Sequence, residues 1–210
     1  MKPASSGRTV LLICGSVAQP SHTEALLGLL AQALAAHSLQ AVVWNLRELP
    51  LPVADPALHE RSHVHPDAAV RRLDRLATAA AGFALASPVY HNSYTGVLKN
   101  ALDNLGIRQF EGKPVALLSH GSPRTCVQAC DHLRIVVRGL YGIAVPTQIA
   151  TVDADFRPEQ VGYRVTNAAV AGRVSQLAGE LAFFIERLSG QPLADPARDG
   201  GGAWPRSAVR

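Results

Sequence analysis

A hydroxyl-rich loop is the first place in this sequence where side chains of a suitable kind could bind an anion. It reads Gly15-Ser16-Val17-Ala18-Gln19-Pro20-Ser21-His22-Thr23-Glu24 and joins a short apolar run to an amphipathic stretch. A loop that opens a helix offers unpaired N–H groups and the positive end of the helix dipole. Ser16, Ser21 and Thr23 add hydroxyl donors, and His22 adds a ring N–H. The pattern predicts a site for a single phosphomonoester.

The same loop lacks the motifs that hold nucleotide phosphates. It has neither the second glycine of G-x-G-x-x-G nor the lysine of a Walker loop. Ser21-x-x-Glu24 is also a capping box, which stabilises a helix by about 1 kcal/mol without any ligand. Two interpretations stay open, a phosphate site and a plain helix cap. The hydroxyl groups beyond the cap favour the phosphate site.

A second loop combines tyrosine, histidine and small polar residues. It reads Ser87-Pro88-Val89-Tyr90-His91-Asn92-Ser93-Tyr94-Thr95-Gly96-Val97-Leu98-Lys99-Asn100. Tyrosine rings provide apolar walls, and the backbone N–H groups of such a loop could face a planar heterocycle. The alternative is a solvated loop in which Thr95 caps the next helix and the aromatic residues have no ligand.

Apolar runs alternate with amphipathic stretches along the chain, which is the signature of βαβ units around a parallel sheet. A loop is expected over 46–66, and the third strand is expected to stop at Pro88, because proline cannot donate a ladder hydrogen bond. Ligands of doubly wound sheets bind beyond the carboxyl ends of the strands, where both loops above and the loop after the fourth strand lie. Strands are predicted over 8–14, 40–45, 82–87, 113–119 and 145–152, and helices over 21–36, 67–80, 95–105, 124–140 and 157–188.

Composition favours one folded domain. Of 210 residues, 48% are hydrophobic and 17% are charged, which excludes disorder of the main body. Residues 1–188 are predicted to form the domain, and 189–210 a flexible tail in which Trp204 could dock. The net charge of +4 favours small anionic ligands but is too low and too scattered for nucleic acid. The early apolar run 9–14 is too short for a signal peptide or a membrane span, and three cysteines fit a reducing compartment, so the cytoplasm is predicted.

Two further sets of residues could ligate a metal, but neither has a complete ligand frame. Cys126 and Cys130 are four residues apart and are predicted to share a helix face, whereas structural zinc needs four ligands. His59, His63 and His65 lie in a Pro-rich segment without a carboxylate or cysteine frame. No metal site is predicted, and the histidine segment is expected to be mobile surface.

The two loops together resemble those of the NAD(P)H-dependent FMN reductase family. The resemblance rests on Gly15-Ser16 with its downstream Ser21-x-Thr23, and on Ser-Pro-Val-Tyr-x-x-Ser-Tyr-x-Gly-x-Leu-Lys-Asn over 87–100. Within the family the chain looks nearest to the reductases of two-component alkanesulfonate monooxygenase systems, which the segment 44–47 (Trp-Asn-Leu-Arg) also resembles. The similarity runs from about residue 10 to the final helix.

The resemblance implies a flavodoxin-like three-layer α/β sandwich, with a five-stranded parallel sheet of order 2-1-3-4-5 and helices on both faces. It implies FMN and NAD(P)H as cofactors, hydride transfer from nicotinamide C4 to flavin N5, and no catalytic acid, base or nucleophile from the protein. It also implies a homodimer or homotetramer in which the helix 95–105 contributes to the contact. Arg124 or His91 would steer the anionic nucleotide. The implied cofactor-binding residues are Ser16, Ser21, His22 and Thr23 for the FMN phosphate, Pro88, Val89, Tyr90 and His91 beside the isoalloxazine ring, and Ser119, Gly121 and Ser122 at its other edge.

One departure from the family bears on function. Many members have an arginine where this chain has Ala18, and its loss removes a bidentate phosphate contact. The implied function is therefore an FMN reductase that supplies reduced flavin to a partner flavin-dependent monooxygenase. The first alternative is a reductase with tightly bound FMN that acts on quinones, azo dyes or metal oxyanions. A flavodoxin-type electron carrier and an inactive interaction subunit are further alternatives, disfavoured by the positive charge and by the two intact loops, respectively.

Overall fold

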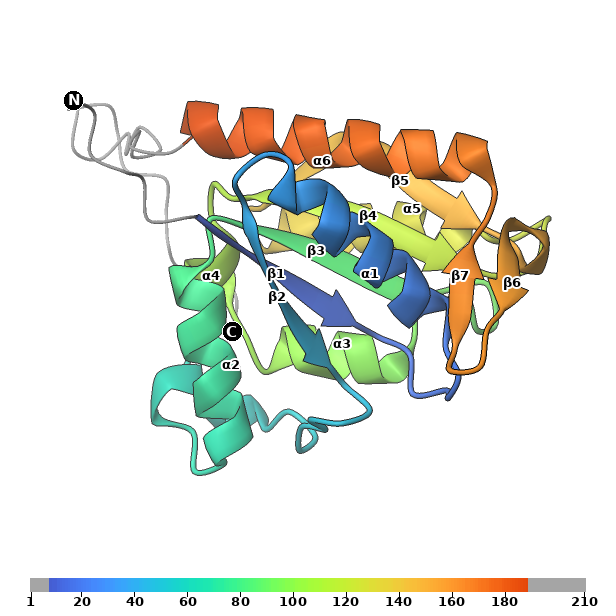
Figure 1. The fold of residues 1–210 in the computed structure, drawn as a ribbon. Coiled ribbons are helices and arrows are strands. Elements are labelled where there is room, and N and C mark those ends of the chain that lie inside the picture. Colours follow the sequence, from blue (N-terminus) through green and yellow to red (C-terminus); the bar gives the residue numbers. More distant parts are fainter. Residues whose placement is uncertain (1–7, 189–210) are drawn as a thin grey trace.

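The computed structural model describes residues 8–188, which form a five-stranded parallel sheet with helices on both faces (Figure 1). Its order is β2-β1-β3-β4-β5, and all four pairings are parallel. This confirms the predicted flavodoxin-like architecture. The predicted tail 189–210, with Trp204, lies outside the described residues. The strands are β1 (Thr9–Cys14), β2 (Gln40–Asn45), β3 (Gly82–Pro88), β4 (Pro114–His120) and β5 (Ile143–Thr151).

Three of the helices begin at a residue whose side chain caps the helix. Ser21 accepts a hydrogen bond from the Glu24 N–H at 3.2 Å, Asp67 caps α2, and Thr95 caps α3. Such caps satisfy N–H groups that have no partner within the helix. The helices are α1 (His22–Ala35), α2 (Ala68–Ala79), α3 (Gly96–Asp103), α4 (Ile107–Phe110), α5 (Gln128–Gly139) and α6 (Ala168–Leu188), with 3₁₀ turns η1 (Pro56–Leu58), η2 (Ser62–Val64) and η3 (Asp153–Asp155).

The sheet separates two hydrophobic layers. Along β1, Val10 and Leu12 pack with the buried faces of α1 and α6, while Leu11 and Ile13 pack with α2, α3 and α5. This alternation follows from the two-residue period of a strand. All of these side chains are buried, because helices cover both faces of a parallel sheet. The rigid sheet therefore fixes where the strand-end loops lie.

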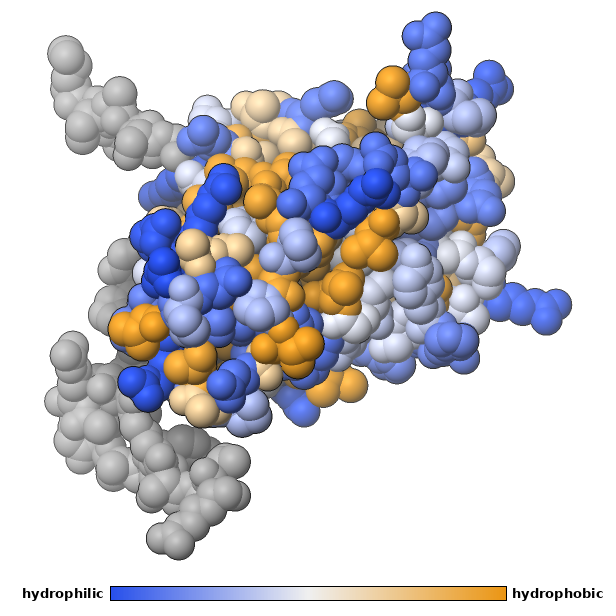
Figure 2. All heavy atoms as spheres, turned by 90° about the horizontal axis from the view of Figure 1, so that it is seen from below, coloured by the Kyte–Doolittle hydropathy of each residue, from blue (hydrophilic) through white to orange (hydrophobic). Residues whose placement is uncertain are grey.

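Helix α6 is apolar and long enough, by length and composition, to cross a membrane, a test that core helices also pass. In this fold its buried residues Val174, Leu177, Leu181 and Ile185 belong to the core layer shared with α1. Elsewhere on the surface, exposed apolar side chains such as Val53 and Val97 are scattered. The view from below shows apolar atoms in patches that polar residues interrupt (Figure 2).

The chain after β5 corrects one prediction. Instead of a helix from 157, the structure has a hairpin of β6 (Phe156–Pro158) and β7 (Tyr163–Val165), and α6 starts only at Ala168. The Glu159 N–H donates to the Gly162 carbonyl at 3.0 Å, and Gly162 has φ +87°, which favours glycine. Pro158 and Gly162 were turn signals that the apolar pattern of the following helix obscured.

Smaller corrections concern four positions. β3 includes Pro88, and the next ladder bond comes from the Val89 N–H to the His120 carbonyl at 2.8 Å. Cys126 lies in the turn before α5, so it does not share a helix face with the buried Cys130. His65 is buried, and its Nδ1 accepts from the Asp67 N–H at 3.0 Å, so it is not mobile surface. The stretch 46–66, predicted as loop, also contains η1 and η2.

Candidate functional site

The loop between β1 and α1 presents a set of hydrogen-bond donors. Ser16, Ser21 and Thr23 are buried, and His22 is half-buried at the first position of α1. Ser16 Oγ and Ser21 Oγ accept from the Ala18 and Glu24 N–H groups, which leaves their own protons free to donate. Within residues 8–188 no partner is found for the N–H groups of Val17, Gln19, Ser21, His22 and Thr23.

Gly15 holds this loop against the loop that follows β3. The Thr95 hydroxyl donates to the Gly15 carbonyl at 2.7 Å, and the Gly15 N–H donates to Ala86 at 2.8 Å. A Cβ at position 15 would lie 2.9 Å from the Cβ of Leu98 and 3.0 Å from the Ala86 carbonyl. Only glycine fits this approach without movement of the backbone, so the two predicted site loops are fixed relative to each other.

Arg47, which the sequence analysis did not single out as a site residue, reaches the same loop from beyond β2. Its guanidinium donates to the Val17 carbonyl at 3.3 Å, and its N–H donates to Asn45 Oδ1 at 3.0 Å. Arg47 is exposed, so its charge is available to a ligand. Arg47 thus brings a cation to the residue next to Ala18, although it lies 29 positions further along the chain. Only the sheet order, with β2 beside β1, could reveal this.

The loop after β3 is a tight turn in which most backbone N–H groups already have hydrogen-bond partners within the protein. Tyr90 and Ser93 exchange two backbone hydrogen bonds, of 2.9 and 3.1 Å, around His91 (φ 48°) and Asn92 (φ 66°). Positive φ at both central residues defines a type I′ turn. Pro88 has no N–H, and the Val89 and Tyr90 N–H groups are already paired. Of the residues 88–91 predicted beside the ring, only His91 has a backbone N–H without a partner among the described residues. Contacts with a ring would therefore come mainly from side chains, including the half-exposed Tyr90.

The loop after β4 packs directly on this turn. A Cβ at Gly121 would lie 2.9 Å from the Cβ of Val89, which explains a glycine here. The Ser119 hydroxyl is buried and donates to the Cys126 carbonyl, and Ser122 is exposed with its hydroxyl 3.0 Å from that of Thr125. The hydroxyl of Ser119 therefore stabilises the loop from within, whereas Gly121 and Ser122 lie on its accessible side. Arg124 is exposed in the same loop.

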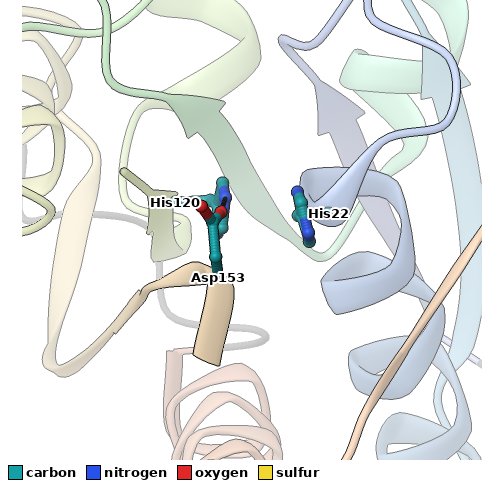
Figure 3. Close-up of side chains that lie close together, drawn as sticks. All are labelled: His22, His120 and Asp153. Atoms are coloured by element: carbon teal, nitrogen blue, oxygen red, sulfur yellow. Dashed lines mark hydrogen bonds and ion pairs between the residues drawn. The ribbon is translucent and has the colours of Figure 1, made fainter. Parts of the chain in front are cut away.

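A group that we call the edge histidine cluster, made of His22, His120, Asp153 and Tyr163, lies at the end of β4. Figure 3 shows His22, His120 and Asp153. The His22 ring stacks on His120 with centroids 4.2 Å apart and on Tyr163 at 3.6 Å. His120 Nε2 lies 3.1 Å from Asp153 Oδ1. Sequence reasoning missed Tyr163, because 157–188 was predicted as helix, and Asp153, because no local pattern marks a carboxylate in the short segment between the predicted strand and helix.

Burial lowers the pKa values of His22 and His120 below the ordinary value for histidine. For His22 the desolvation is partly offset by Asp153, and for His120 the neighbouring His22 lowers the pKa further while Asp153 raises it. The ligating atoms of His22, His120 and Asp153 lie within 4.8 Å of one another. The two imidazoles are stacked at 19°, however, so their lone pairs lie in nearly parallel planes and do not converge on one ion. The arrangement suits proton chemistry better than metal binding.

Comparison with known proteins identifies the family. The family model described as NADPH-dependent FMN reductase matches residues 8–156. This chain belongs to that family. A relative named FMN-dependent NADPH-azoreductase, from Staphylococcus aureus, is 36% identical over 181 residues, which cover 83% of this chain and 94% of the relative. The protein is accordingly an oxidoreductase that uses FMN and a nicotinamide nucleotide.

Solved structures agree on the fold. An oxidoreductase from Corynebacterium diphtheriae superimposes with a TM-score of 0.64 at 25% identity, over 86% of this chain and 97% of its own. The apo form of an NADH:FMN oxidoreductase (EMOB) superimposes with a TM-score of 0.65 at 23% identity, over 91% and 99% of the two chains. These similarities establish the flavodoxin-like architecture of this chain.

The residues of the β1–α1 loop fit the FMN phosphate. Five unpaired N–H groups, two serine hydroxyls with free protons and the Arg47 guanidinium surround one helix N-terminus, which is the donor set that a phosphate dianion needs. No carboxylate of the described residues accepts from these donors, although Glu24 bonds Asn45 at 3.4 Å nearby. The site thus matches the chemistry of the cofactor that the family uses.

Proposed function

We propose that this protein is an NAD(P)H-dependent reductase that retains FMN and transfers electron pairs to small aromatic acceptors such as azo compounds and quinones. The observation that carries the proposal is the 36% identity, over 94% of its length, to the relative named FMN-dependent NADPH-azoreductase. The assignment reverses the order of the two candidate functions favoured by the sequence, where the absence of an arginine at Ala18 pointed to loosely held flavin.

Arg47 is the structural reason for that reversal. With its guanidinium at the Val17 carbonyl, the phosphate loop regains a cation that can form charge-assisted hydrogen bonds with the FMN phosphate. Such bonds contribute about 1.5–3 kcal/mol each when they are shielded, and less at an exposed position. The loop therefore has the means to retain FMN between catalytic cycles.

The residues have separate tasks in this proposal. Ser16, Ser21, Thr23 and Arg47 hold the phosphate, Tyr90 and Val89 bound one edge of the ring, and Gly121 and Ser122 the other. Bound FMN supplies the redox chemistry, receiving a hydride from the nicotinamide and reducing the acceptor. The protein orients both substrates against the ring and limits the access of water. We place this activity in the cytoplasm, as the short apolar run 9–14 and the three cysteines predict, and within a homodimer or homotetramer, as the resemblance implies.

An absorbance spectrum of the desalted protein, followed by NAD(P)H oxidation with an azo dye and no added FMN, tests the proposal. Retained FMN gives a yellow protein, dye reduction without added flavin and ping-pong kinetics. A colourless protein whose NAD(P)H oxidation requires free FMN contradicts it.

That second outcome would favour the other candidate, a reductase that supplies reduced FMN to a partner monooxygenase. The specific observation in its favour is Ala18, which is exposed and carries no charge at the position where many family members have arginine.

A further inference from the structure

The hydrogen bonds of His120 place a proton on its Nε2 nitrogen. The Thr151 hydroxyl donates to the Ser119 carbonyl at 3.0 Å, so toward His120 Nδ1, at 3.3 Å, the Thr151 oxygen is an acceptor. His120 Nε2 faces Asp153 Oδ1, also an acceptor, at 3.1 Å. With Thr151 bonded to Ser119, the imidazolium form donates at both nitrogens; in the neutral Nε2–H tautomer the Thr151 hydroxyl can instead turn to donate to Nδ1. In both forms Nε2 carries a proton that it donates to Asp153.

The surroundings of the ring make this proton easy to lose. The side chain of His120 is only 12% exposed, and burial together with the stacked His22 lowers its pKa. The carboxylates of Asp153 and Asp155 raise the pKa in part. Because its pKa is lowered, the charged ring gives up the Nε2 proton more readily than an ordinary histidine does, which favours a role as general acid.

His120 also lies at a cavity beside the loop predicted to border the flavin. It pairs with Pro88 in the sheet, and its carbonyl accepts from the Val89 N–H at 2.8 Å. The cavity has a volume of about 470 Å³ and is lined by His120, Gly121, Ser122 and Pro123 on one side and by 152–154 on the other. This volume lies within the range of sites for small organic molecules.

We propose that His120 is the proton donor to the organic acceptor that binds in this cavity, with Asp153 and Thr151 as its positioning residues. The inference rests on the proposed function, because reduction of an azo or quinone group by two electrons needs one hydride and one proton. The hydride derives from NAD(P)H by way of FMN. The second azo nitrogen takes the place of the exposed Asp153 carboxylate, which lines the same cavity, at His120 Nε2. The Nε2–H bond then breaks as an N–H bond forms on that nitrogen and the N=N π bond is lost, so that NAD(P)H is oxidised and the azo group becomes a hydrazine.

Asp153 is suited to restore the proton from solvent. Its side chain is 89% exposed, while its Oδ1 lies 3.1 Å from His120 Nε2. Thr151 fixes the plane of the ring from the other side, and His22 covers one face by stacking. The titratable groups that face His120 are therefore His22 from α1, and Asp153 and Asp155 from the segment after β5.

The test compares two electron acceptors on the FMN-loaded enzyme. An azo dye needs a proton, whereas ferricyanide takes one electron at a time and needs none. We expect His120→Gln to lower kcat with the dye by about 100-fold or more, the range of general acid catalysis, while the ferricyanide rate stays within about 3-fold. The dissociation constant of the dye for the oxidised holoenzyme, measured by absorbance, should change little. His37→Gln, an exposed histidine at the other end of α1, serves as the matched control and should change neither rate.

Asp153→Asn provides a second variant at an exposed position that the fold tolerates. Removing this carboxylate should lower the pKa of His120, visible by NMR titration of its ring, and shift the loss of dye reduction with rising pH to lower pH. An equal effect of His120→Gln on both acceptors, or on neither, overturns the inference, since His120 would then be structural. A wild-type enzyme that reduces ferricyanide with NAD(P)H but no dye would instead refute the proposed acceptor class.

Discussion

Two polar clusters in this molecule, one at α2 and α4 and one at the end of β4, both contain a carboxylate but differ in how well their hydrogen bonds are matched. The buried carboxylate cluster consists of Ser62, Asp74, Arg108 and Gln109, and it joins η2, α2 and α4. Asp74 Oδ1 accepts from all three partners at 2.6–2.7 Å, and Asp74 is only 4% exposed. Every hydrogen bond there has a donor matched to an acceptor, as a structural network requires.

The edge histidine cluster has no such balance. Its His120 lies between the oxygens of Thr151 and Asp153, its histidines have lowered pKa values, and its Asp153 is open to solvent. A fully satisfied cluster stabilises one conformation, whereas groups whose protonation and environment conflict are poised to exchange protons or bind a ligand. The contrast indicates that the first cluster supports the fold and the second belongs to the site.

The largest effect should come from Asp74→Ala. The change removes the acceptor that three donors of the buried carboxylate cluster share. We expect a loss of about 3 kcal/mol in the free energy of unfolding, measured with urea. The dissociation constant of FMN should stay within about 2-fold, because the variant leaves the phosphate loop intact. A large loss of FMN affinity in a folded variant would mean that the two clusters are coupled.

Arg47→Ala should have the next largest effect, on cofactor binding alone. Loss of its guanidinium should raise the dissociation constant of FMN by about 10-fold, measured by quenching of flavin fluorescence, with little change in stability. Arg75→Ala removes the same charge from an exposed position on α2 and is the matched control. If the two variants raise the dissociation constant of FMN equally, Arg47 acts only through long-range attraction between its charge and the FMN phosphate.

Ser21→Ala separates capping from ligand binding. Loss of the cap should lower stability by about 1 kcal/mol, and loss of a hydroxyl donor should raise the dissociation constant of FMN by about 3-fold. Asp67→Ala removes the corresponding cap of α2, far from the site, and should lower stability similarly without affecting FMN. If Ser21→Ala also leaves FMN affinity unchanged, Ser21 is only a helix cap.

The smallest effect is a dependence of stability on pH. Since burial lowers the pKa of His22 and His120, the unfolded chain binds more protons than the folded one below about pH 6.5, the ordinary histidine pKa. Stability should therefore decrease as pH falls below that value, and these two groups should contribute no slope above it. Urea unfolding at several pH values with His22→Gln should show a shallower decrease than wild type, and an unchanged slope would contradict the assignment.

The sequence by itself determined the order of elements, the parallel sheet and the loops that carry chemistry. Ser21 and Thr95 were predicted as caps because capping depends on residues within one turn of the helix. The five strands were readable as apolar runs because both faces of a parallel sheet are buried. Where the signals were local but mixed, as at Pro158 and Gly162, the apolar pattern of α6 concealed the hairpin.

Tertiary structure decided everything that depends on neighbours distant in sequence. Arg47 reaches the phosphate loop because β2 lies beside β1, and His22, His120, Asp153 and Tyr163 come together because α1, β4 and the hairpin end at the same edge. Burial of His65 and the pairing of the Val89 and Tyr90 amides were likewise invisible in the sequence. The reason is physical: hydrogen-bond partners, desolvation and pKa values depend on distances in space, and periodicity along one chain encodes only which face of an element is buried.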